Sequence, residues 1–60
     1  MRLENLLPVL DEYGKTEIID TETLTTLALS DGRDAIPESL NGRQVDYITA
    51  ADNTIRVYVI

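Results

Sequence analysis

Apolar side chains near the start of the chain recur at the spacing of one helix face. Four leucines occupy positions i, i+3, i+4 and i+7, which lie on the same side of an α-helix. They are Leu3, Leu6, Leu7 and Leu10. Gly14 follows them, and glycine accepts the left-handed geometry at which many helices end. The pattern predicts a short helix within 2–13 whose leucine face joins the core.

Pro8 complicates this helix, because proline has no backbone N–H and its ring crowds the preceding turn. Two arrangements fit the sequence. Either Pro8 lies in the first turn of a helix capped by Asn5, or a helix that begins at about Arg2 bends at Pro8. Both arrangements keep the helix within 2–13.

The last residues of the chain alternate between β-branched and mixed side chains. Successive side chains of a strand point to opposite faces of the sheet, so Ile55, Val57 and Val59 share one face, which we expect to be buried. The run before them is also rich in residues that favour strands. Asp52 and Asn53 separate the two runs and tolerate turn geometry. These features predict an antiparallel hairpin with its turn at these two residues, or a loop of about three or four residues there.

The same alternation assigns faces in the other expected strands. Residues 15–20 form one strand, in which Ile18 and Ile19 point to opposite faces. Residues 24–29 form the next strand, with its last two leucines on one face. In the first strand of the hairpin, one face receives Val45, Tyr47 and Thr49, and the other receives Asp46, Ile48 and Ala50.

Residues 36–42 predict a single helical turn, because a proline stands near their start and Asn-Gly at their end. Ile36 and Leu40 would tether this turn to the core. The order of elements predicts an α+β fold in one domain, residues 1–60: a short N-terminal helix packed on a four-stranded antiparallel sheet, with one extra helical turn between strands 2 and 3. The main core candidates are Leu3, Leu6, Leu7, Leu10, Ile18, Leu27, Val45, Ile55, Val57 and Val59.

Composition narrows the chemistry that the chain can hold. Its 60 residues include no cysteine and no histidine, which excludes disulfides and zinc sites built from thiolate or imidazole ligands. Its serines have no histidine base and its three glycines are isolated, so the usual nucleophile pairs and phosphate-binding loops are missing. No apolar run approaches the roughly 18 residues of a membrane span, and we expect no membrane partner.

Charge argues against one large class of partners. Eleven acidic residues stand against five basic ones, a net charge of −6. Binding to a phosphate backbone takes clustered lysine and arginine, which this balance opposes. An acidic surface fits solubility, mimicry of nucleic acid or a basic partner.

Carboxylates remain as candidate ligands for a hard cation, because Mg²⁺ needs only oxygen ligands and retained waters. Four acids near the ends of the first strand could converge on such an ion: Asp11, Glu12, Asp20 and Glu22. Asp31 and Asp34 form a second pair, and neither group matches a calcium loop. Asp11 and Asp20 would then be the candidate catalytic acids. If the chain catalyses no metal-dependent reaction, we expect no cofactor.

Tyrosines are the only aromatic residues: Tyr13, Tyr47 and Tyr58. Stacking platforms for single-stranded nucleic acid place aromatics among basic residues, and Tyr58 beside Arg56 on one strand face would suit that role. Tyrosine on a half-buried sheet face is also ordinary strand composition, and we give this explanation more weight.

The apolar end of the chain predicts self-association. An unpaired apolar strand edge is an aggregation liability that proteins usually cover, and a domain of this size is marginal by itself. We therefore expect a homo-oligomer, a two-fold dimer or a dimer of dimers. Its interface would be formed by Arg56, Val57, Tyr58, Val59 and Ile60, either by strand addition at this edge or by packing of the two open sheet faces. The alternative is that the last strand lies centrally within its own sheet.

Four segments carry a family resemblance: the opening Arg-Leu-Glu-Asn-Leu-Leu-Pro-Val-Leu-Asp-Glu, then Thr-Glu-Ile-Ile-Asp, Ile-Pro-Glu-Ser-Leu and the closing Thr-Ile-Arg-Val-Tyr-Val-Ile. They resemble short proteins carried by gut Firmicutes, their phages and their mobile elements. Some similar small proteins are counter-defence factors, including type II anti-CRISPR proteins. One such family has a sheet like that of a single-stranded-DNA-binding transcriptional coactivator and acts on supercoiled DNA.

The resemblance implies a small acidic interaction protein, working as an oligomer in the cytoplasm of a bacterial host. It would inhibit a type II CRISPR nuclease directly, as a DNA mimic, or through DNA topology. Two alternatives stay open: a metal-dependent protein that nicks DNA, and an accessory or structural phage protein without a defence role. Mg²⁺ is implied only by the nicking alternative.

Overall fold

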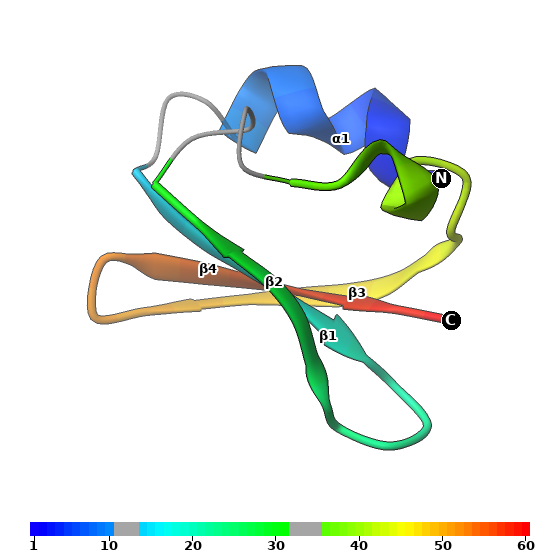
Figure 1. Cartoon of the computed structure of the whole chain (residues 1–60). Coiled ribbons are helices and arrows are strands. Elements are labelled where there is room, and N and C mark those ends of the chain that lie inside the picture. The colour runs from blue at the N-terminus through cyan, green and yellow to red at the C-terminus, as the bar shows by residue number, and fades with distance from the viewer. Residues whose placement is uncertain (11–13, 32–35) are drawn as a thin grey trace.

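The computed structural model describes residues 1–10, 14–31 and 36–60. Within them, one short helix and a 3-10 turn accompany four strands (Figure 1). The elements are α1 (Leu3–Leu10), β1 (Lys15–Asp20), β2 (Thr26–Ser30), η2 (Glu38–Leu40), β3 (Val45–Ala51) and β4 (Thr54–Val59). The α+β class predicted from the sequence is confirmed. The extra helical turn between β2 and β3 is present and is a 3-10 turn.

The sheet is mixed, and the prediction of a purely antiparallel sheet is wrong. Its strand order is β2-β1-β4-β3. Each hairpin is antiparallel, but β1 and β4 lie side by side and run parallel. Turn chemistry fixes which strands form a hairpin, whereas it says nothing about how two hairpins dock. The docking therefore depends on contacts between residues far apart in the sequence.

The helix and the 3-10 turn lie over the same face of the twisted sheet (Figure 1). The core forms between these two elements and the sheet. Its buried cluster consists of Leu3, Leu7, Leu10, Ile18, Ile36, Leu40, Val57 and Val59. Leu6, Leu27, Val45 and Ile55 are partly buried against this cluster. Every residue predicted for the core is therefore confirmed, as is the tethering of the 3-10 turn by Ile36 and Leu40.

The helix begins at Leu3 and contains Pro8 in its interior, so the arrangement with Asn5 as its cap is wrong. The first N–H groups of a helix have no partner within it. Here the loop before β3 supplies two acceptors: the N–H of Leu3 donates to the carbonyl of Arg43 at 2.9 Å, and that of Glu4 to the carbonyl of Asn41 at 3.0 Å. Tertiary contacts thus hold the first turn, and the exposed Pro8 ring faces away from the core.

A β-bulge changes the faces of β3. Val45 pairs with Val59, but the next paired residue is Tyr47, opposite Tyr58. The extra residue reverses the alternation, so Val45 faces the core while Tyr47 and Thr49 face the other side. The prediction that these three side chains share a face is wrong for this reason.

A second register shift lies between Ile18 and Ile19 and affects β2. Leu27 packs against the core, whereas Leu29 stands opposite Glu17 and is 68% exposed. The two leucines predicted to share a face therefore do not. Ile18 and Ile19 do point to opposite faces, as predicted, since Ile18 belongs to the core cluster and Ile19 does not.

The hairpin turn is the two-residue type. Ala51 pairs directly with Thr54, and the residues between them have positive φ, 53° at Asp52 and 60° at Asn53. Positive φ at both central positions defines a type I′ turn, whose twist matches that of the strands. The prediction of a turn at Asp52–Asn53 is confirmed, and the longer loop is excluded.

Replacing Asn53 with glycine is expected to stabilise the protein by about 0.5 kcal/mol, because glycine adopts positive φ without a steric cost and Asp-Gly suits this turn. Denaturant unfolding of both proteins measures the difference. Thr23→Gly, in an exposed turn without a positive φ, is the matched control and should destabilise. A loss of stability in Asn53→Gly would contradict the turn assignment.

Candidate functional site: the open face of the sheet

The sheet face away from α1 carries two straight rows of side chains, one residue from each strand. We call this surface the open face. Strand pairing places the first row as Thr26, Ile19, Tyr58 and Tyr47. It places the second as Leu29, Glu17, Arg56 and Thr49. None of the described elements covers these rows, and in Figure 1 the helix and the 3-10 turn both lie on the opposite side.

An aromatic pair dominates the first row. The rings of Tyr47 and Tyr58 are stacked, with centroids 4.3 Å apart and planes 11° from parallel. Such pairs contribute about 0.5–1.5 kcal/mol beyond the area they bury. Ile19 lies beside Tyr58 and is only 7% exposed although it is outside the core cluster. The open face thus has a small packed layer of its own, and Tyr47 remains 46% exposed at its margin.

A paired charge dominates the second row. Arg56 Nε donates a hydrogen bond to Glu17 Oε1 at 3.1 Å, and Thr26 Oγ1 donates to the other carboxylate oxygen. The prediction that Tyr58 and Arg56 share a strand face fits this register. The arginine, however, is neutralised by Glu17 and does not stand free beside the tyrosine. A single-stranded nucleic acid would find aromatic rings here, but little free positive charge for its phosphates.

Asp20, the predicted catalytic and metal-binding acid, holds a turn. Its Oδ1 accepts the N–H groups of Glu22 at 2.8 Å and Thr23 at 3.3 Å. Its Oδ2 accepts a hydrogen bond from Arg43 at 3.2 Å. The two backbone N–H groups, and then Arg43, lower the pKa of Asp20 below its usual value of 3.8. A metal ion at Asp20 would have to displace donors that already serve both oxygens.

The remaining acids predicted to bind metal are not brought together among the described residues. Asp11, Glu12 and Asp34 lie outside those residues. Glu22 and Asp31 are exposed. In the part of the chain that the structure describes, no three acidic side chains gather into a group able to hold a metal ion. The convergence of Asp11 and Glu12 with Asp20 and Glu22 stays a prediction.

Acidification is expected to remove the contribution of Asp20 to stability. Because its pKa in the folded state lies below 3.8, that contribution is complete above this value and is lost as the pH falls through the lowered pKa. Asp20→Asn keeps an oxygen acceptor but cannot titrate. Denaturant unfolding from roughly pH 5 to pH 2 should therefore show a steeper loss in the wild type than in the variant. Parallel loss in the two proteins would show that the turn does not depend on the charge.

The residues of the predicted oligomer interface belong to a central strand and point to both faces of the sheet. β4 is paired with β1 on one side and β3 on the other, so its expected free edge does not exist. Val57 and Val59 are fully buried in the core of their own chain. Arg56 and Tyr58 point to the open face, and Ile60 is 59% exposed. Strand addition at β4 is therefore wrong, because β1 already occupies that edge. Packing of two open sheet faces stays a prediction.

Of the eight residues in these two rows, only Tyr58 and Arg56 were proposed from the sequence as a possible binding pair. A usable signal existed for one of the other six, Tyr47. A two-residue turn at Asp52–Asn53 places Tyr47 directly opposite Tyr58 when the pairs are counted back from the turn. The contacts made by β1 and β2 carried no such signal, because they cross from one hairpin to the other.

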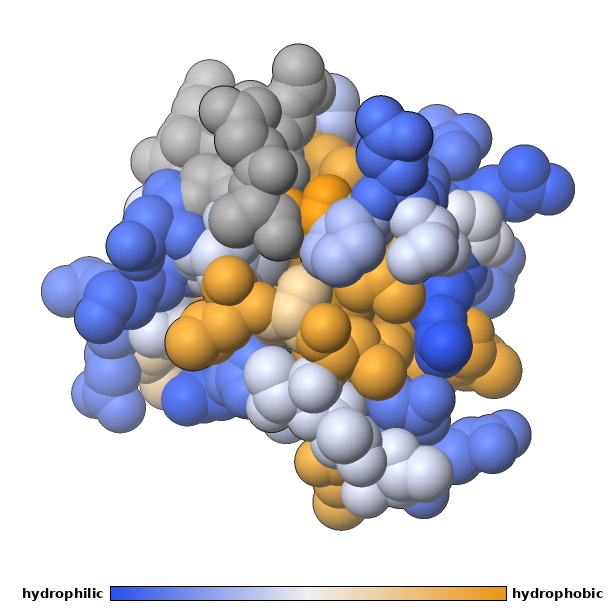
Figure 2. Space-filling model, viewed as in Figure 1, coloured by the Kyte–Doolittle hydropathy of each residue, from blue (hydrophilic) through white to orange (hydrophobic). Residues whose placement is uncertain are grey.

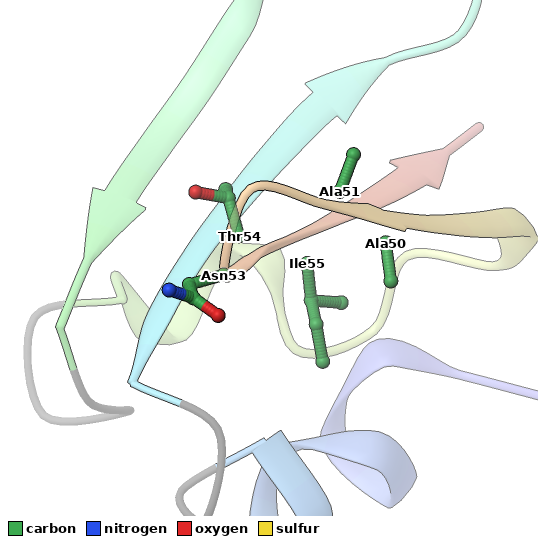
Figure 3. A pocket seen from close by; sticks show the side chains of 5 residues that line it. All are labelled: Ala50, Ala51, Asn53, Thr54 and Ile55. Carbon is green, nitrogen blue, oxygen red and sulfur yellow. The ribbon is translucent and has the colours of Figure 1, made fainter.

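A shallow hollow of about 340 Å³ lies at the turn end of the β3–β4 hairpin. The described residues that line it are Ala50, Ala51, Asn53, Thr54 and Ile55. Figure 3 shows Ala50 and Ile55 pointing to one side of the hairpin and Ala51 and Thr54 to the other. The small alanines leave room here that a larger side chain could fill.

Comparisons with family models, curated proteins and solved structures find no match for this chain. No described helix is long and apolar enough to cross a membrane.

Proposed function

We propose that this protein acts by binding a basic surface of another protein through its open face. The observation that carries the proposal is the Tyr47–Tyr58 stack on a sheet face that no described element covers. Tyrosine is enriched at protein interfaces because it offers a large, rigid contact area at a low cost in conformational entropy. The ring of Tyr47 is already held in place by Tyr58, so little further ordering accompanies binding.

Charge supports a basic partner. The chain has a net charge of −6, and two of its arginines, Arg43 and Arg56, are paired with Asp20 and Glu17. With these two pairs set aside, nine acidic residues and three basic ones remain in the chain. Complementary charge speeds association and suppresses partners of the same sign, which opposes direct binding to a phosphate backbone.

The partner that we favour is a type II CRISPR nuclease in the cytoplasm of a bacterial host. Two considerations support it: the resemblance to counter-defence proteins, and the positively charged channel in which such nucleases hold their guide–target duplex. An acidic protein with an aromatic face would compete with nucleic acid for that channel. The two rival functions, metal-dependent nicking of DNA and an accessory role in a phage, stay predictions that the same experiments separate.

A plasmid-cleavage assay with a type II nuclease tests this function. Added wild-type protein should protect the plasmid, and protection should weaken as salt is raised from low to physiological strength. Tyr47→Ala should lower the affinity by roughly thirtyfold, the effect of a residue worth about 2 kcal/mol at an interface. Val9→Ala is the matched control, because Val9 is 52% exposed but lies on α1.

Three results would count against the proposal. Cleavage that proceeds unhindered would remove the nuclease as the partner. Equal effects of Tyr47→Ala and Val9→Ala would remove the open face as the binding surface. A nicked plasmid that appears with Mg²⁺ and disappears with a chelator would favour the nicking function, and Asp11→Asn with Asp20→Asn should then abolish nicking.

A further inference from the structure

From Tyr47 to Ala51, beyond its bulge, the outer edge of β3 lacks the usual protection of an edge strand. β3 lies at one end of the sheet, and its residues from 47 to 51 are Tyr-Ile-Thr-Ala-Ala, all exposed and without charge. Natural proteins guard such edges with charges, prolines, bulges or a covering segment. Here the first residues of the chain cover only the start of this edge. The N–H of Val45 donates to the carbonyl of Met1 at 2.8 Å, and Arg2 forms a β-bridge with Gln44. No described segment pairs with the edge after Val45.

The hairpin geometry shows which backbone groups this edge presents. Ala51 and Thr54 close a two-residue turn, and the residues that close such a turn bond to each other. Backbone bonds of an antiparallel pair alternate along the strand, so Tyr47, Thr49 and Ala51 direct theirs toward β4. Ile48 and Ala50 direct their N–H and C=O groups outward. These groups can bind another extended strand.

We propose that β3 pairs with β3 of a second copy, antiparallel, about a two-fold axis at Thr49. Ile48 then bonds with Ala50 of the partner subunit, so that the outward groups of both strands are used. The two four-stranded sheets join into one continuous sheet. The assembly uses backbone groups at the edge of β3, whereas the proposed function uses side chains of the open face, so the assembly can fail while the proposed function holds, and the reverse.

Side-chain size favours this register. Residues directly opposite each other in an antiparallel pair share a face of the sheet. The large Ile48 therefore stands beside the small Ala50 of the partner subunit, and Tyr47 stands beside the partner's Ala51. The strand is thus complementary to itself when reversed. Ala50 and Ala51 point to opposite sides of the hairpin, so the incoming isoleucine and the incoming tyrosine each meet a small side chain.

Neighbouring registers are poorer. Moving the axis from Thr49 toward Tyr47 pairs Ala50 with the bulge at Asp46 of the partner subunit. Moving it toward the turn pairs Ile48 with Asp52 of the partner subunit, whose φ of 53° does not continue a strand. Only the axis at Thr49 keeps the regular residues 47–51 of both copies in register.

β2, the other edge strand, is the competing site. Apolar residues gather in the middle of the side of the molecule that β2 crosses, with hydrophilic residues around them (Figure 2). Leu29 of this strand is 68% exposed. The register shift opposite Ile18 and Ile19, however, interrupts β2 within its five residues. A regular edge of sufficient length is therefore present on β3 and not on β2.

Sedimentation equilibrium across the micromolar range tests the assembly. The wild type should pass from monomer to dimer as its concentration rises. Ile48→Lys places a charge on the edge, and Ala50→Pro removes an outward N–H that makes no bond to β4, so both should stay monomeric. Leu29→Lys makes the same charge change on β2 and should still dimerise. Circular dichroism checks that each variant is folded.

A disulfide test checks the register directly, because the chain has no cysteine of its own. At the axis, Thr49 stands opposite its own copy in a non-hydrogen-bonded pair, with Cα atoms about 4.5 Å apart, within the range that a disulfide spans. Thr49→Cys should form a covalent dimer on mild oxidation. Ala51→Cys should not, because its two copies would be displaced by roughly 14 Å along the strands.

Two outcomes would overturn the pairing of the β3 edges. One is a wild-type protein that stays monomeric throughout the concentration range. The other is a dimer that survives Ile48→Lys and Ala50→Pro, which would assign the contact to β2 or to the open face. Equal cross-linking of Thr49→Cys and Ala51→Cys would overturn the register even if the edge is correct.

Discussion

A chain that ends at Tyr58 is expected to be unfolded, because Val59 closes the core from the centre of the sheet. Val59 is fully buried. Its carbonyl accepts the N–H of Thr21 at 2.8 Å, and the N–H of Ile60 donates to Gln44 at 2.9 Å. Burying a valine contributes about 1.5–3 kcal/mol, and each hydrogen bond about 0.5–1.5 kcal/mol. A 60-residue domain has only roughly 3–9 kcal/mol in total.

Circular dichroism and thermal unfolding of the shortened chain provide the measurement. The matched control removes Ile60 alone, a side chain that is 59% exposed, and should leave a folded protein that is destabilised by the loss of one backbone bond. If the last residues instead formed the oligomer interface that the sequence predicted, the same truncation would release a smaller folded species. A folded monomer ending at Tyr58 would contradict the central position of β4.

Replacing Leu3 with alanine is expected to cost roughly 2–5 kcal/mol of unfolding free energy, the range measured for buried leucines. Leu3 is fully buried, and it belongs to the core cluster with Ile18 and Val57. The helix that carries it has only eight residues, too few to be stable in isolation. Leu3→Ala therefore removes one of the three buried side chains that hold α1 on the sheet, the others being Leu7 and Leu10.

Leu24→Ala is the control for this experiment, since it deletes the same atoms from a leucine that is 68% exposed. It should change stability by no more than about 0.5 kcal/mol. Urea unfolding of the three proteins, monitored by circular dichroism, measures both differences. A cost for Leu3→Ala as small as that for Leu24→Ala would mean that α1 does not pack where the structure places it.

The sequence by itself determined the elements whose cause is local. The leucine spacing predicted α1, the residues of β1 were identified with their bounds, and Asp52–Asn53 predicted the hairpin turn. Each depends on residues a few positions apart, through helical periodicity, strand alternation or turn geometry. The candidate site could be predicted only in part. Spacing along the strand placed Tyr58 and Arg56 on one face, but it could not show that Glu17 and Ile19, which belong to the other hairpin, lie beside them.

Tertiary structure alone decided how these elements fit together. Glu17 and Arg56 are separated by 39 residues, and they meet because β1 and β4 pair in parallel, a choice that no local pattern specifies. Bulges in two strand pairs then reversed the faces of side chains that strict alternation had assigned, since one extra residue turns every later side chain over. The same docking put β4 at the centre of the sheet and left β3 at its edge. Several arrangements of the two hairpins would satisfy their hydrogen bonds equally well, and core packing selects one of them. That packing depends on contacts between distant residues, which form only in the folded chain.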